Sequence, residues 1–337
     1  MKIDNILVTG GTGFFGNHFV HYIINKHPRI KRLVIFSRDE NKQYEMMRLF
    51  PVKKYPFMRY FIGDIRDKKR LLRALNGIDI VVHAAALKHV PSAEYNPTEY
   101  IKTNIYGAQN LIEACLDSNV KKVIALSTDK ASSPINLYGA TKLCSDKLFI
   151  AANQLTGSNK LSFSIVRYGN VMGSRGSVIP FFLNQKSKGF LTVTDKRMTR
   201  FNITLQEGVN FVLLCLKQMW GGEIFVPKIP SYRLIDLVKA ISPNVKIKYI
   251  GIRPGEKLHE EMISNDEGPN TVEFKNYFSI IPNSDLIQWS KKKYLSNNRG
   301  GKILKSNFSY NSQNNKNFLN VSELRKLINI NLSDIQE

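Results

Sequence analysis

The sequence predicts an α/β fold, in which a doubly wound parallel sheet carries a smaller α/β lobe. The first half alternates short, continuous apolar runs with longer helical stretches, a rhythm typical of parallel βαβ units. A glycine-rich turn follows the first apolar run, and beyond about Tyr168 the pattern loosens into glycine-containing loops. The candidate strands are residues 3–8, 33–36, 58–62, 78–82, 122–126 and 163–166.

The composition is that of a globular protein with an unusual charge. Of 337 residues, 49 are basic and 27 acidic, which gives a formal net charge of +22. Because the basic residues are spread over the whole chain without a long basic block, we expect a solvated basic surface rather than a nucleic-acid site. Such a surface would also favour a substrate that carries phosphates.

Membrane and metal sites are not expected. No apolar run approaches the roughly 18 residues that cross a bilayer, and the N-terminus enters a strand directly rather than a signal peptide. Cys115, Cys144 and Cys215 are odd in number and widely separated, so they are expected to be small core residues in a reducing compartment. These observations predict a cytoplasmic protein without a metal site.

A glycine-rich turn joins the first strand to an amphipathic helix. Gly10 permits a tight turn, Gly13 lets the backbone approach a pyrophosphate, and Gly16 lets helix and strand pack closely. The helix N-terminus adds N–H donors and the positive end of its dipole. We therefore predict a dinucleotide-binding turn of the Rossmann type. Its predicted contacts are Gly10, Thr12, Gly13, Phe14, Phe15 and Gly16.

The end of the second strand indicates which nicotinamide cofactor binds. An acidic residue there would bind the ribose 2′-hydroxyl of NAD and repel the 2′-phosphate of NADP. The sequence instead has Ser37 and Arg38, and a guanidinium matches a phosphate with two parallel hydrogen bonds. We therefore predict NADP. The alternative is that Arg38 is only solvated and that Asp39 binds the ribose of NAD.

Other strand ends complete the predicted cofactor site. Asp64 and Ile65 follow the third strand and suit a contact to the adenine, and Ala84 and Ala86 follow the fourth strand and would let the cofactor lie against the backbone. The further predicted cofactor contacts are Asp39, Glu40, Lys42, Lys88 and Thr103.

The second half of the chain is predicted to supply the smaller lobe. We expect residues 1–167 to form an NADP-binding Rossmann domain and residues 168–337 to form mainly a substrate-binding lobe, with segments near 201–228 returning to the Rossmann domain. Residues 290–316 are rich in Lys, Asn, Ser and Gly and are expected to be a loosely ordered connection. The expected elements are a helix at 205–218, strands at 223–226 and 246–249, and a helix at 321–328 that Asn320 and Glu323 would cap.

Tyr138 and Lys142 carry the strongest chemical signal in the chain. A helix places residues four apart on one face, so the positive charge of Lys142 would lower the pKa of Tyr138 toward that of a working general base. Lys142 could also hold the nicotinamide ribose. The ordinary alternative, a surface Tyr beside a solvated Lys, is disfavoured by the glycine turn upstream.

At these residues the chain resembles the extended short-chain dehydrogenase/reductases. Within them it is similar to the inverting UDP-N-acetylglucosamine 4,6-dehydratases of bacterial pseudaminic acid synthesis. The resemblance covers nearly the whole chain. It is carried by residues 9–13, 37–40, 83–90, 127–130, 136–142, 167–171 and 253–257.

The resemblance implies a three-stage reaction on a UDP-sugar. Tyr138 takes the proton of the 4-hydroxyl while hydride leaves C4, and the resulting ketone acidifies C5. Lys130, which stands where retaining relatives have Glu, then removes the C5 proton, and a protonated Asp129 delivers a proton to the departing 6-hydroxyl. Hydride returns to C6, and C5 is reprotonated from the opposite face. Thr128 would hold the reacting hydroxyl.

For Lys130 to act as a base its pKa must fall, as burial or a nearby positive charge would achieve. The alternative is that Lys130 simply pairs with Asp129 or with solvent. The resemblance also implies a homo-oligomer and a set of contacts to UDP-N-acetylglucosamine. These contacts are Lys88, Asn170, Val171, Arg175, Val178, Ile179, Phe181, Thr192, Thr194, Arg200, Arg253 and Glu256.

Three rival functions stay open. An enzyme of the same fold could epimerise C5, and also C3, on the way to an amino sugar of the L series, or it could be a simple 4-epimerase. A non-catalytic, basic Rossmann module that binds nucleotides or nucleic acid is a different class, and the intact pair of Tyr138 and Lys142 argues against it.

Overall fold

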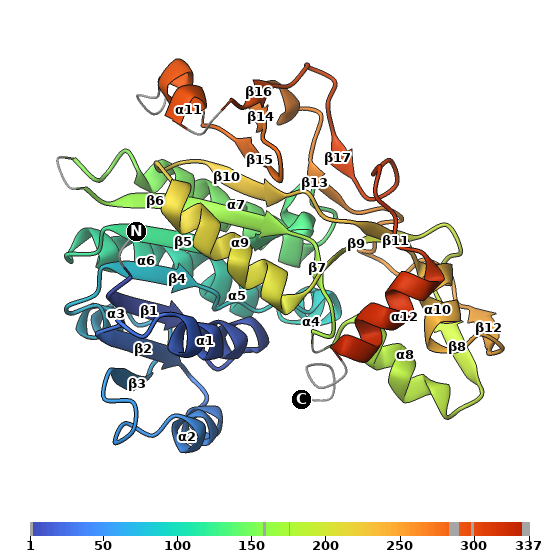
Figure 1. Ribbon diagram of the computed structural model, residues 1–337, viewed down its shortest axis with the longest axis horizontal. Coiled ribbons are helices and arrows are strands. Elements are labelled where there is room, and N and C mark those ends of the chain that lie inside the picture. The colour runs from blue at the N-terminus through green and yellow to red at the C-terminus, as the bar shows by residue number, and fades with distance from the viewer. Residues whose placement is uncertain (1–2, 158–159, 175, 283–289, 298–299, 332–337) are drawn as a thin grey trace.

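The computed structural model describes residues 3–157, 160–174, 176–282, 290–297 and 300–331. A ten-stranded sheet forms the centre of this described part, with parallel strands from β3 to β10 and antiparallel additions at the other edge. Its parallel part confirms the predicted doubly wound sheet. In spatial order the strands are β16 (Lys302–Ile303), β14 (Thr271–Glu273), β15 (Tyr277–Ile280), β10 (Ile224–Pro227), β6 (Ser162–Tyr168), β5 (Lys122–Thr128), β4 (Ile80–His83), β1 (Asn5–Thr9), β2 (Arg32–Ser37) and β3 (Met58–Ile62) (Figure 1).

The six strands predicted in the first half are confirmed, with ends within two residues of the expected positions. β5 continues beyond its apolar run because Ser127 and Thr128 still pair with Arg167 and Tyr168 of β6. Ladder hydrogen bonds are made by the backbone, so polar side chains can end a strand without ending the pairing. This extension places polar groups at the carboxyl edge of the sheet.

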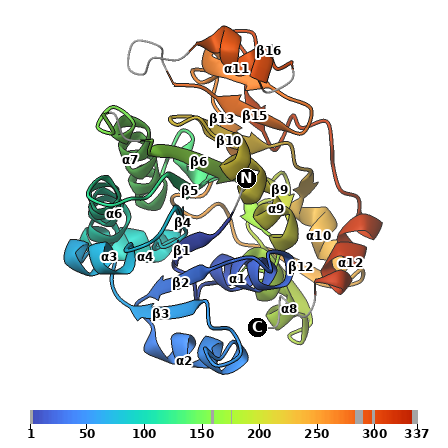
Figure 2. The same ribbon diagram turned by 60° about the vertical axis from the view of Figure 1, so that its left-hand side comes forward.

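Helices cover both faces of the sheet. Two of them contact each other on one face, and three pack side by side on the other (Figure 2). The first group is α1 (Phe14–Lys26) and α9 (Leu205–Gln218), and the second is α3 (Lys68–Ala74), α6 (Gly107–Leu116) and α7 (Leu137–Ala152). Between β4 and α6 run α4 (Val90–Tyr95), α5 (Pro97–Tyr100) and the π-helical turn η1 (Ile101–Tyr106), while α2 (Glu40–Leu49) follows β2. No helix of the described ranges is long and apolar enough to cross a bilayer.

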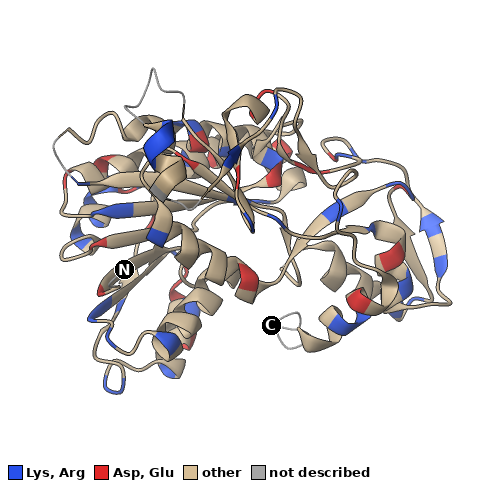
Figure 3. Ribbon diagram, turned by 45° about the horizontal axis from the view of Figure 1, so that its top comes forward, with Lys and Arg blue, Asp and Glu red and all other residues tan. Residues whose placement is uncertain are grey.

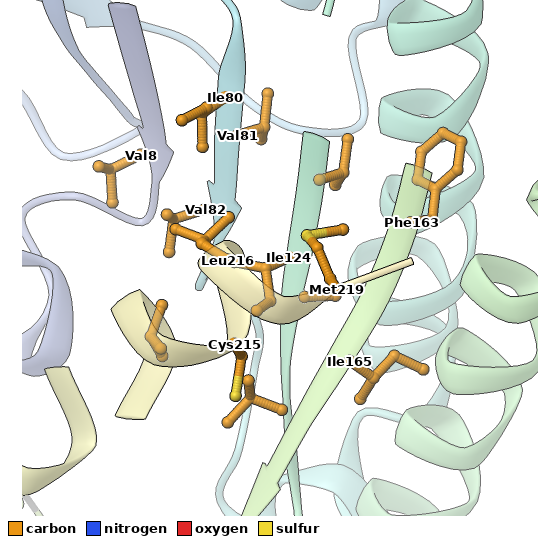
Figure 4. Close-up of a cluster of buried hydrophobic side chains, with 14 of the residues drawn as sticks. Val8, Ile80, Val81, Val82, Ile124, Phe163, Ile165, Cys215, Leu216 and Met219 are labelled. Atoms are coloured by element: carbon orange, nitrogen blue, oxygen red, sulfur yellow. The ribbon is translucent and has the colours of Figure 1, made fainter. Parts of the chain in front are cut away.

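The main core lies on both faces of the sheet, and part of it lies between α9 and the central strands. Cys215 and Leu216 of α9, together with Met219 at its C-cap, pack over strand residues that include Ile124 and Ile165 (Figure 4). The helix occupies the range predicted for it, and a capping box of Thr204 and Glu207 begins it.

The expectation that all three cysteines lie in the core is wrong for one of them. Cys115 and Cys215 are buried, whereas Cys144 is exposed. Cys144 follows Lys142 on α7 by two positions, which turns it away from the helix face that packs on the sheet.

The smaller lobe lies at the carboxyl end of the parallel strands, on the right in Figure 1. A three-stranded sheet, a strand pair and three helices enclose a second core around Phe182, Leu191 and Leu237. These elements are β11 (Ser231–Arg233), β9 (Thr199–Ile203) and β7 (Asn170–Val171), the pair β12 (Lys246–Tyr249) and β8 (Phe190–Val193), and α8 (Val178–Lys186), α10 (Leu234–Ile241) and α12 (Val321–Ile330). Asn320 and Glu323 form the predicted capping box of α12.

The prediction of a loosely ordered connection over residues 290–316 is wrong for its described part. This stretch contains α11 (Lys291–Asn297), β16 and β17 (Tyr310–Asn311), and β17 pairs with β13 (Glu261–Ile263). Tyr294 is fully buried, and its hydroxyl lies 2.8 Å from that of Ser279. Single aromatic anchors such as Tyr294 order a polar segment that has no apolar periodicity of its own.

Lys and Arg are spread over both parts of the molecule and are interspersed with Asp and Glu (Figure 3). This distribution agrees with the spread of basic residues along the sequence. Among the described residues, no group of His, Cys, Asp and Glu is arranged to hold a metal ion.

Candidate active site

The candidate site lies at the carboxyl edge of the parallel strands, where β1, β4, β5 and β6 end. This edge is where open α/β sheets bind ligands. The glycine turn follows β1, and the 3-10 turn η2 (Asp129–Ala131) follows β5. Sequence segments that are more than 100 residues apart therefore meet at one edge of the sheet.

The glycine turn has the shape of a diphosphate cradle. Gly10 has a φ of 65°, and a Cβ on it would lie 2.9 Å from backbone atoms of Ala85, while a Cβ on Gly16 would collide with the carbonyl oxygen of Gly10. Gly13 is the N-cap of α1 and makes no side-chain capping bond, so the first N–H groups of the helix are left for a ligand. The residues present fit a dinucleotide. Thr12, Phe14 and Phe15 lie in this turn, at the start of α1.

At the end of β2, the Arg38 side chain is half-exposed, whereas the Asp39 carboxylate is hydrogen-bonded to α2. Asp39 caps α2, accepting from the backbone N–H of Lys42 at 3.0 Å and lying 2.9 Å from its Nζ. These contacts, the backbone hydrogen bond first, hold the pKa of Asp39 below its ordinary value. The half-exposed Arg38 guanidinium lies 3.5 Å from Asp64, whose carboxylate also binds Arg66 at 2.7 Å. Asp39 is thus engaged with the helix, whereas the Arg38 guanidinium is half-exposed.

Two buried polar side chains that the sequence analysis missed shape this half of the site. Gln43 donates from Nε2 to the backbone oxygen and the hydroxyl of Ser37, both at 3.0 Å. Asn104 of η1 holds the turn after β4, because its amide group bonds both the N–H and the carbonyl of Leu87 at 2.9 Å. It also donates to Thr141 of α7 at 3.0 Å.

The other predicted cofactor contacts surround the same edge. Thr103, beside Asn104, is buried, and its hydroxyl has no hydrogen-bond partner among the described residues. A ligand at this edge could use that hydroxyl. Ile65 packs under Gly107, while Ala84 and Ala86 lie in the turn after β4 and Glu40 begins α2.

Tyr138 of α7 is buried beside Thr128. Burial raises its pKa to about 12, although the positive charge of Lys130 and a hydrogen bond with Thr128 act to lower it. We predicted that Lys142 would be the cation that lowers the pKa of Tyr138. In the structure the charge that acts most to lower the pKa of the phenol is that of Lys130. Lys142 donates its Nζ to the carbonyl of Leu126 at 2.8 Å.

Asp129 is buried and pairs with Lys130, whose side chain is 24% exposed. The Nζ of Lys130 lies 3.0 Å from Oδ1 of Asp129 and 3.5 Å from Oε1 of Glu260, and Thr128 donates to Asp129 at 2.9 Å. Burial raises the pKa of Asp129, and the charge of Lys130 opposes that rise. The structure shows the pairing that the alternative interpretation of Lys130 assumed.

The pKa of Lys130 differs from our expectation. Burial alone would lower it, but the carboxylates of Asp129 and Glu260 outweigh burial and raise it above its ordinary value. The pKa of Lys88, in the turn after β4, is lowered by loss of solvation and then by the charge of Lys130. The resting site therefore holds one ammonium between two carboxylates rather than a neutral amine.

A second buried charge cluster lies behind Lys142. Asp146, one helical turn further along α7, accepts from Ser127 at 2.7 Å and lies 3.5 Å from Arg167. Arg167 is 1% exposed and donates to both carboxylate oxygens of Glu267 at 2.9 Å. Burial lowers the pKa of Lys142, and the charge of Asp146 opposes this. The cluster thus supports the charged form of Lys142.

A narrow cavity beside β7 brings four of the predicted substrate contacts together. Asn170 connects it to the reaction centre, because its Oδ1 accepts from Lys130 at 3.4 Å. Tyr232, which the sequence analysis missed, is buried there, and burial raises its pKa to about 12 while a hydrogen bond with Asn170 lowers it. The cavity is lined by Asn170, Val171, Met172, Ser177, Val178, Ile179, Asn202 and Tyr232.

Arg200 and Arg253, which were predicted to contact the substrate, already have partners within the protein. The Arg200 guanidinium donates to the backbone oxygens of Thr199 at 2.7 Å and of Lys257 at 3.1 Å, and its Nε lies 3.5 Å from Glu260. Arg253 is 60% exposed and pairs with Glu256. A contact of Arg200 with substrate therefore stays a prediction, whereas the exposed Arg253 has room for one.

The lobe holds the remaining predicted contacts. Thr192 of β8 is bonded within the lobe, since its backbone N–H donates to Gln185 at 3.0 Å. The others are Phe181, exposed on α8, Thr194, directly after β8, and Arg175, which lies outside the described residues.

Some of the residues that the sequence analysis missed had a signal and others had none. Asp146 stands four residues after Lys142, a spacing that places both on one helix face. Glu260 lies 130 positions after Lys130, so no local spacing relates the two residues.

Comparison with known proteins agrees with this geometry. Residues 6–282 match the polysaccharide biosynthesis protein family. An inverting UDP-N-acetylglucosamine 4,6-dehydratase of Campylobacter jejuni is 53% identical over 329 residues, which are 96% of this chain and 97% of that protein. The crystal structure of Pen from Bacillus thuringiensis superposes with a TM-score of 0.87 and 39% identity over 99% of both chains.

A more distant structure shows a nicotinamide cofactor on this fold. DesIV of Streptomyces venezuelae, a dTDP-glucose 4,6-dehydratase with NAD and TYD bound, has a TM-score of 0.66 and 26% identity over 75% of this chain and 86% of its own. With its glycine turn, its buried Tyr138 and its near full-length similarity, this chain belongs to the polysaccharide biosynthesis protein family and, within it, to the inverting UDP-N-acetylglucosamine 4,6-dehydratases.

Proposed function

We propose that this protein converts UDP-N-acetylglucosamine to UDP-2-acetamido-2,6-dideoxy-β-L-arabino-hex-4-ulose and water, with inversion at C5. The observation that carries the proposal is the pair of Asp129 and Lys130 at the carboxyl edge of the sheet, beside Tyr138. This pair supplies an acid and an amine next to each other, where a retaining enzyme would have two carboxylates. The similarity to the Campylobacter jejuni dehydratase supports the same reaction.

The first stage is oxidation at C4. A nicotinamide cofactor, when bound at the glycine turn, supplies the chemistry of accepting the C4 hydride and returning it to C6. The phenolate form of Tyr138 accepts the proton of the 4-hydroxyl, and the charge of Lys130 and the Thr128 hydrogen bond favour that form against the rise in pKa that burial causes. The ketone at C4 then acidifies the C5 proton.

The second stage is elimination of the 6-hydroxyl. Lys130 removes the C5 proton, and Asp129 delivers a proton to the hydroxyl, which leaves as water. At rest, Asp129 and Lys130 hold one acidic proton between them. Lys130 becomes a base when that proton passes to Asp129 over the 3.0 Å between Nζ and Oδ1. Burial favours this transfer, because it raises the pKa of Asp129. The C5 proton goes to Lys130, and the hydroxyl leaves as water with the proton from Asp129. C5 then regains a solvent-derived proton on its opposite face.

The test is incubation of the purified protein with UDP-N-acetylglucosamine in D₂O, with the product identified by NMR. We expect the L-arabino 4-keto sugar with deuterium at C5. The D-xylo product would contradict inversion, and a C4 epimer without deuterium at C5 would show a 4-epimerase. Absence of turnover together with salt-sensitive retention on RNA would favour a non-catalytic basic module.

We also propose NADP as the cofactor. Support comes from the half-exposed Arg38 at the end of β2 and from the engagement of Asp39 with α2. Arg38→Ala should weaken NADP binding in calorimetric titration at least tenfold, the loss of one charge-assisted bond of about 1.5–3 kcal/mol, and leave NAD binding unchanged. Equal losses for both cofactors would contradict this assignment.

The same resemblance leads us to propose that the enzyme is a cytoplasmic homo-oligomer whose product enters pseudaminic acid-type sugars and protein glycosylation. Sedimentation of the purified protein tests the oligomer. Nucleotide-sugar profiles of cytoplasmic extracts, with and without the gene, test the compartment and the product.

A further inference from the structure

A strap formed by residues 253–261 closes over the loop that leads to Tyr138. Asn136 donates to the carbonyl of Gly255 at 2.8 Å, and Lys257 donates to the carbonyl of Ser132 at 2.6 Å. At the end of the strap, Glu261 accepts from Ser133 at 2.8 Å. The strap is therefore docked on the reaction centre by bonds from several of its residues.

Glu260 directs its carboxylate from this strap into the site. Its side chain is 4% exposed, with Oε1 3.5 Å from the Nζ of Lys130 and 3.5 Å from the Nε of Arg200. Its Oε2 is buried without a hydrogen-bond partner among the described residues. The backbone of Glu260 is held on both sides by Ser312, with bonds of 2.9 and 2.7 Å. A carboxylate held in the interior is costly unless cations lie close to it.

The ammonium of Lys130 is surrounded by oxygens from three different elements. Asp129 Oδ1 lies at 3.0 Å, Asn170 Oδ1 at 3.4 Å and Glu260 Oε1 at 3.5 Å. A lysine side chain has four rotatable bonds, so an ion pair with the preceding residue does little to restrict the direction of its ammonium group. Asn170 and Glu260 therefore restrict the ammonium from outside η2, and of these two Glu260 carries a charge.

The proposed reaction makes this second carboxylate necessary. While Asp129 acts as the acid it is protonated and no longer attracts Lys130 by charge. When Lys130 takes the C5 proton it becomes a cation in a buried site. Glu260 remains charged throughout and is the anion that can hold Lys130 in both states.

We propose that Glu260 is a positioning residue for the dehydration, which keeps the Nζ of Lys130 over the sugar and stabilises the charge that Lys130 acquires at elimination. This inference rests on the proposed function. It concerns a residue that does not itself exchange a proton with the substrate.

The ionisation of the neighbours agrees with this role. Burial raises the pKa of Glu260, but the charges of Lys130, Arg200 and Lys257 outweigh it, so its pKa is below the ordinary value and the carboxylate is charged at neutral pH. The titratable and charged groups that face Lys130 are Asp129, Glu260, Arg200, Lys88, Lys257, Tyr138 and Tyr232.

The test compares Glu260→Gln, Glu260→Asp and the adjacent Glu261→Gln in the full-length enzyme with cofactor. Glu260→Gln keeps the shape and removes the charge, so kcat should fall about 100- to 10,000-fold, the range of general acid–base effects, with KM within twofold. Reduced nicotinamide should accumulate in single turnover, because C4 oxidation proceeds and elimination is slow. Glu261→Gln should keep wild-type kcat, since an amide oxygen still accepts from Ser133.

The pH profile of kcat distinguishes positioning through charge from simple loss of structure. Removing a negative charge lowers the proton affinity of the pair of Asp129 and Lys130, so both limbs of the profile of Glu260→Gln should move to lower pH. Glu260→Asp should lose part of kcat and keep the wild-type profile. An unchanged profile in Glu260→Gln, or equal losses in Glu260→Gln and Glu261→Gln, would overturn the inference.

The two proposals fail differently. If the wild-type enzyme forms no L-arabino product, the proposed function is wrong whatever Glu260 does. If the wild-type enzyme forms that product and Glu260→Gln turns over normally, only the positioning role is wrong. Cofactor titration and thermal unfolding of each variant show that it is folded, and Glu260→Asp keeps the test decisive if Glu260→Gln does not fold.

Discussion

Replacing the buried Arg167 by Met should cost the fold several kcal/mol. Arg167 is 1% exposed, donates to both oxygens of Glu267 at 2.9 Å and to the carbonyl of Met262 at 3.0 Å, and lies 3.5 Å from Asp146. Arg167→Met removes this cation from both carboxylates, and Lys142 remains as the positive charge that acts on Asp146. Breaking a buried pair in this way costs about 3–5 kcal/mol, out of a total stability of about 5–15 kcal/mol.

The measurement is urea unfolding of Arg167→Met and of a matched exposed control, Arg66→Met. Arg66 also pairs with two carboxylates, Asp64 and Glu99, both at 2.7 Å, but its side chain is 36% exposed. Exposed pairs contribute about 0–1 kcal/mol, so the control should lose little. If both variants lose similar free energy of unfolding, the argument from burial is wrong.

The loss in Arg167→Met should also depend on pH. In the wild-type protein burial raises the pKa of Asp146 and the charge of Arg167 opposes this, so the substitution raises the pKa further above the unfolded value of about 3.9. A carboxyl group with a raised folded pKa destabilises the fold above that pKa and ceases to do so below the unfolded value. The difference from wild type should be greatest at neutral pH and shrink toward about pH 4. A difference independent of pH would contradict this reasoning.

Two further predictions concern the cofactor turn and the base. Gly10→Ala should weaken cofactor binding more than tenfold in calorimetric titration, because its methyl would lie 2.9 Å from the backbone of Ala85. The control Gly77→Ala has a similar positive φ and nothing within 4 Å of the added methyl, so it should bind cofactor normally. Equal binding by both variants would refute the steric argument. Lys130→Glu should bind cofactor yet lose elimination or form the D-xylo product, read by NMR, and unchanged turnover and product would show that another group is the base.

Local features of this chain could be predicted from sequence because their causes act over a few residues. The apolar runs of the first half predicted six strands, since strands covered on both faces must be continuously hydrophobic. The capping box of Asn320 and Glu323 and the turn at Gly10 depend on backbone positions at most a helical turn apart. The spacing of Tyr138 and Lys142 placed both on α7 in the same way.

Tertiary structure alone decided which charges that are distant in the sequence meet. Glu260 reaches Lys130, and Glu267 reaches Arg167, because the strap and the edge strands return to the sheet about 100 or more residues later. The same return explains why Lys130 is held as an ammonium and why Tyr294 orders a polar segment. Short-range patterns carry no information on such pairings, since the burial and field at a side chain depend on the path of distant backbone.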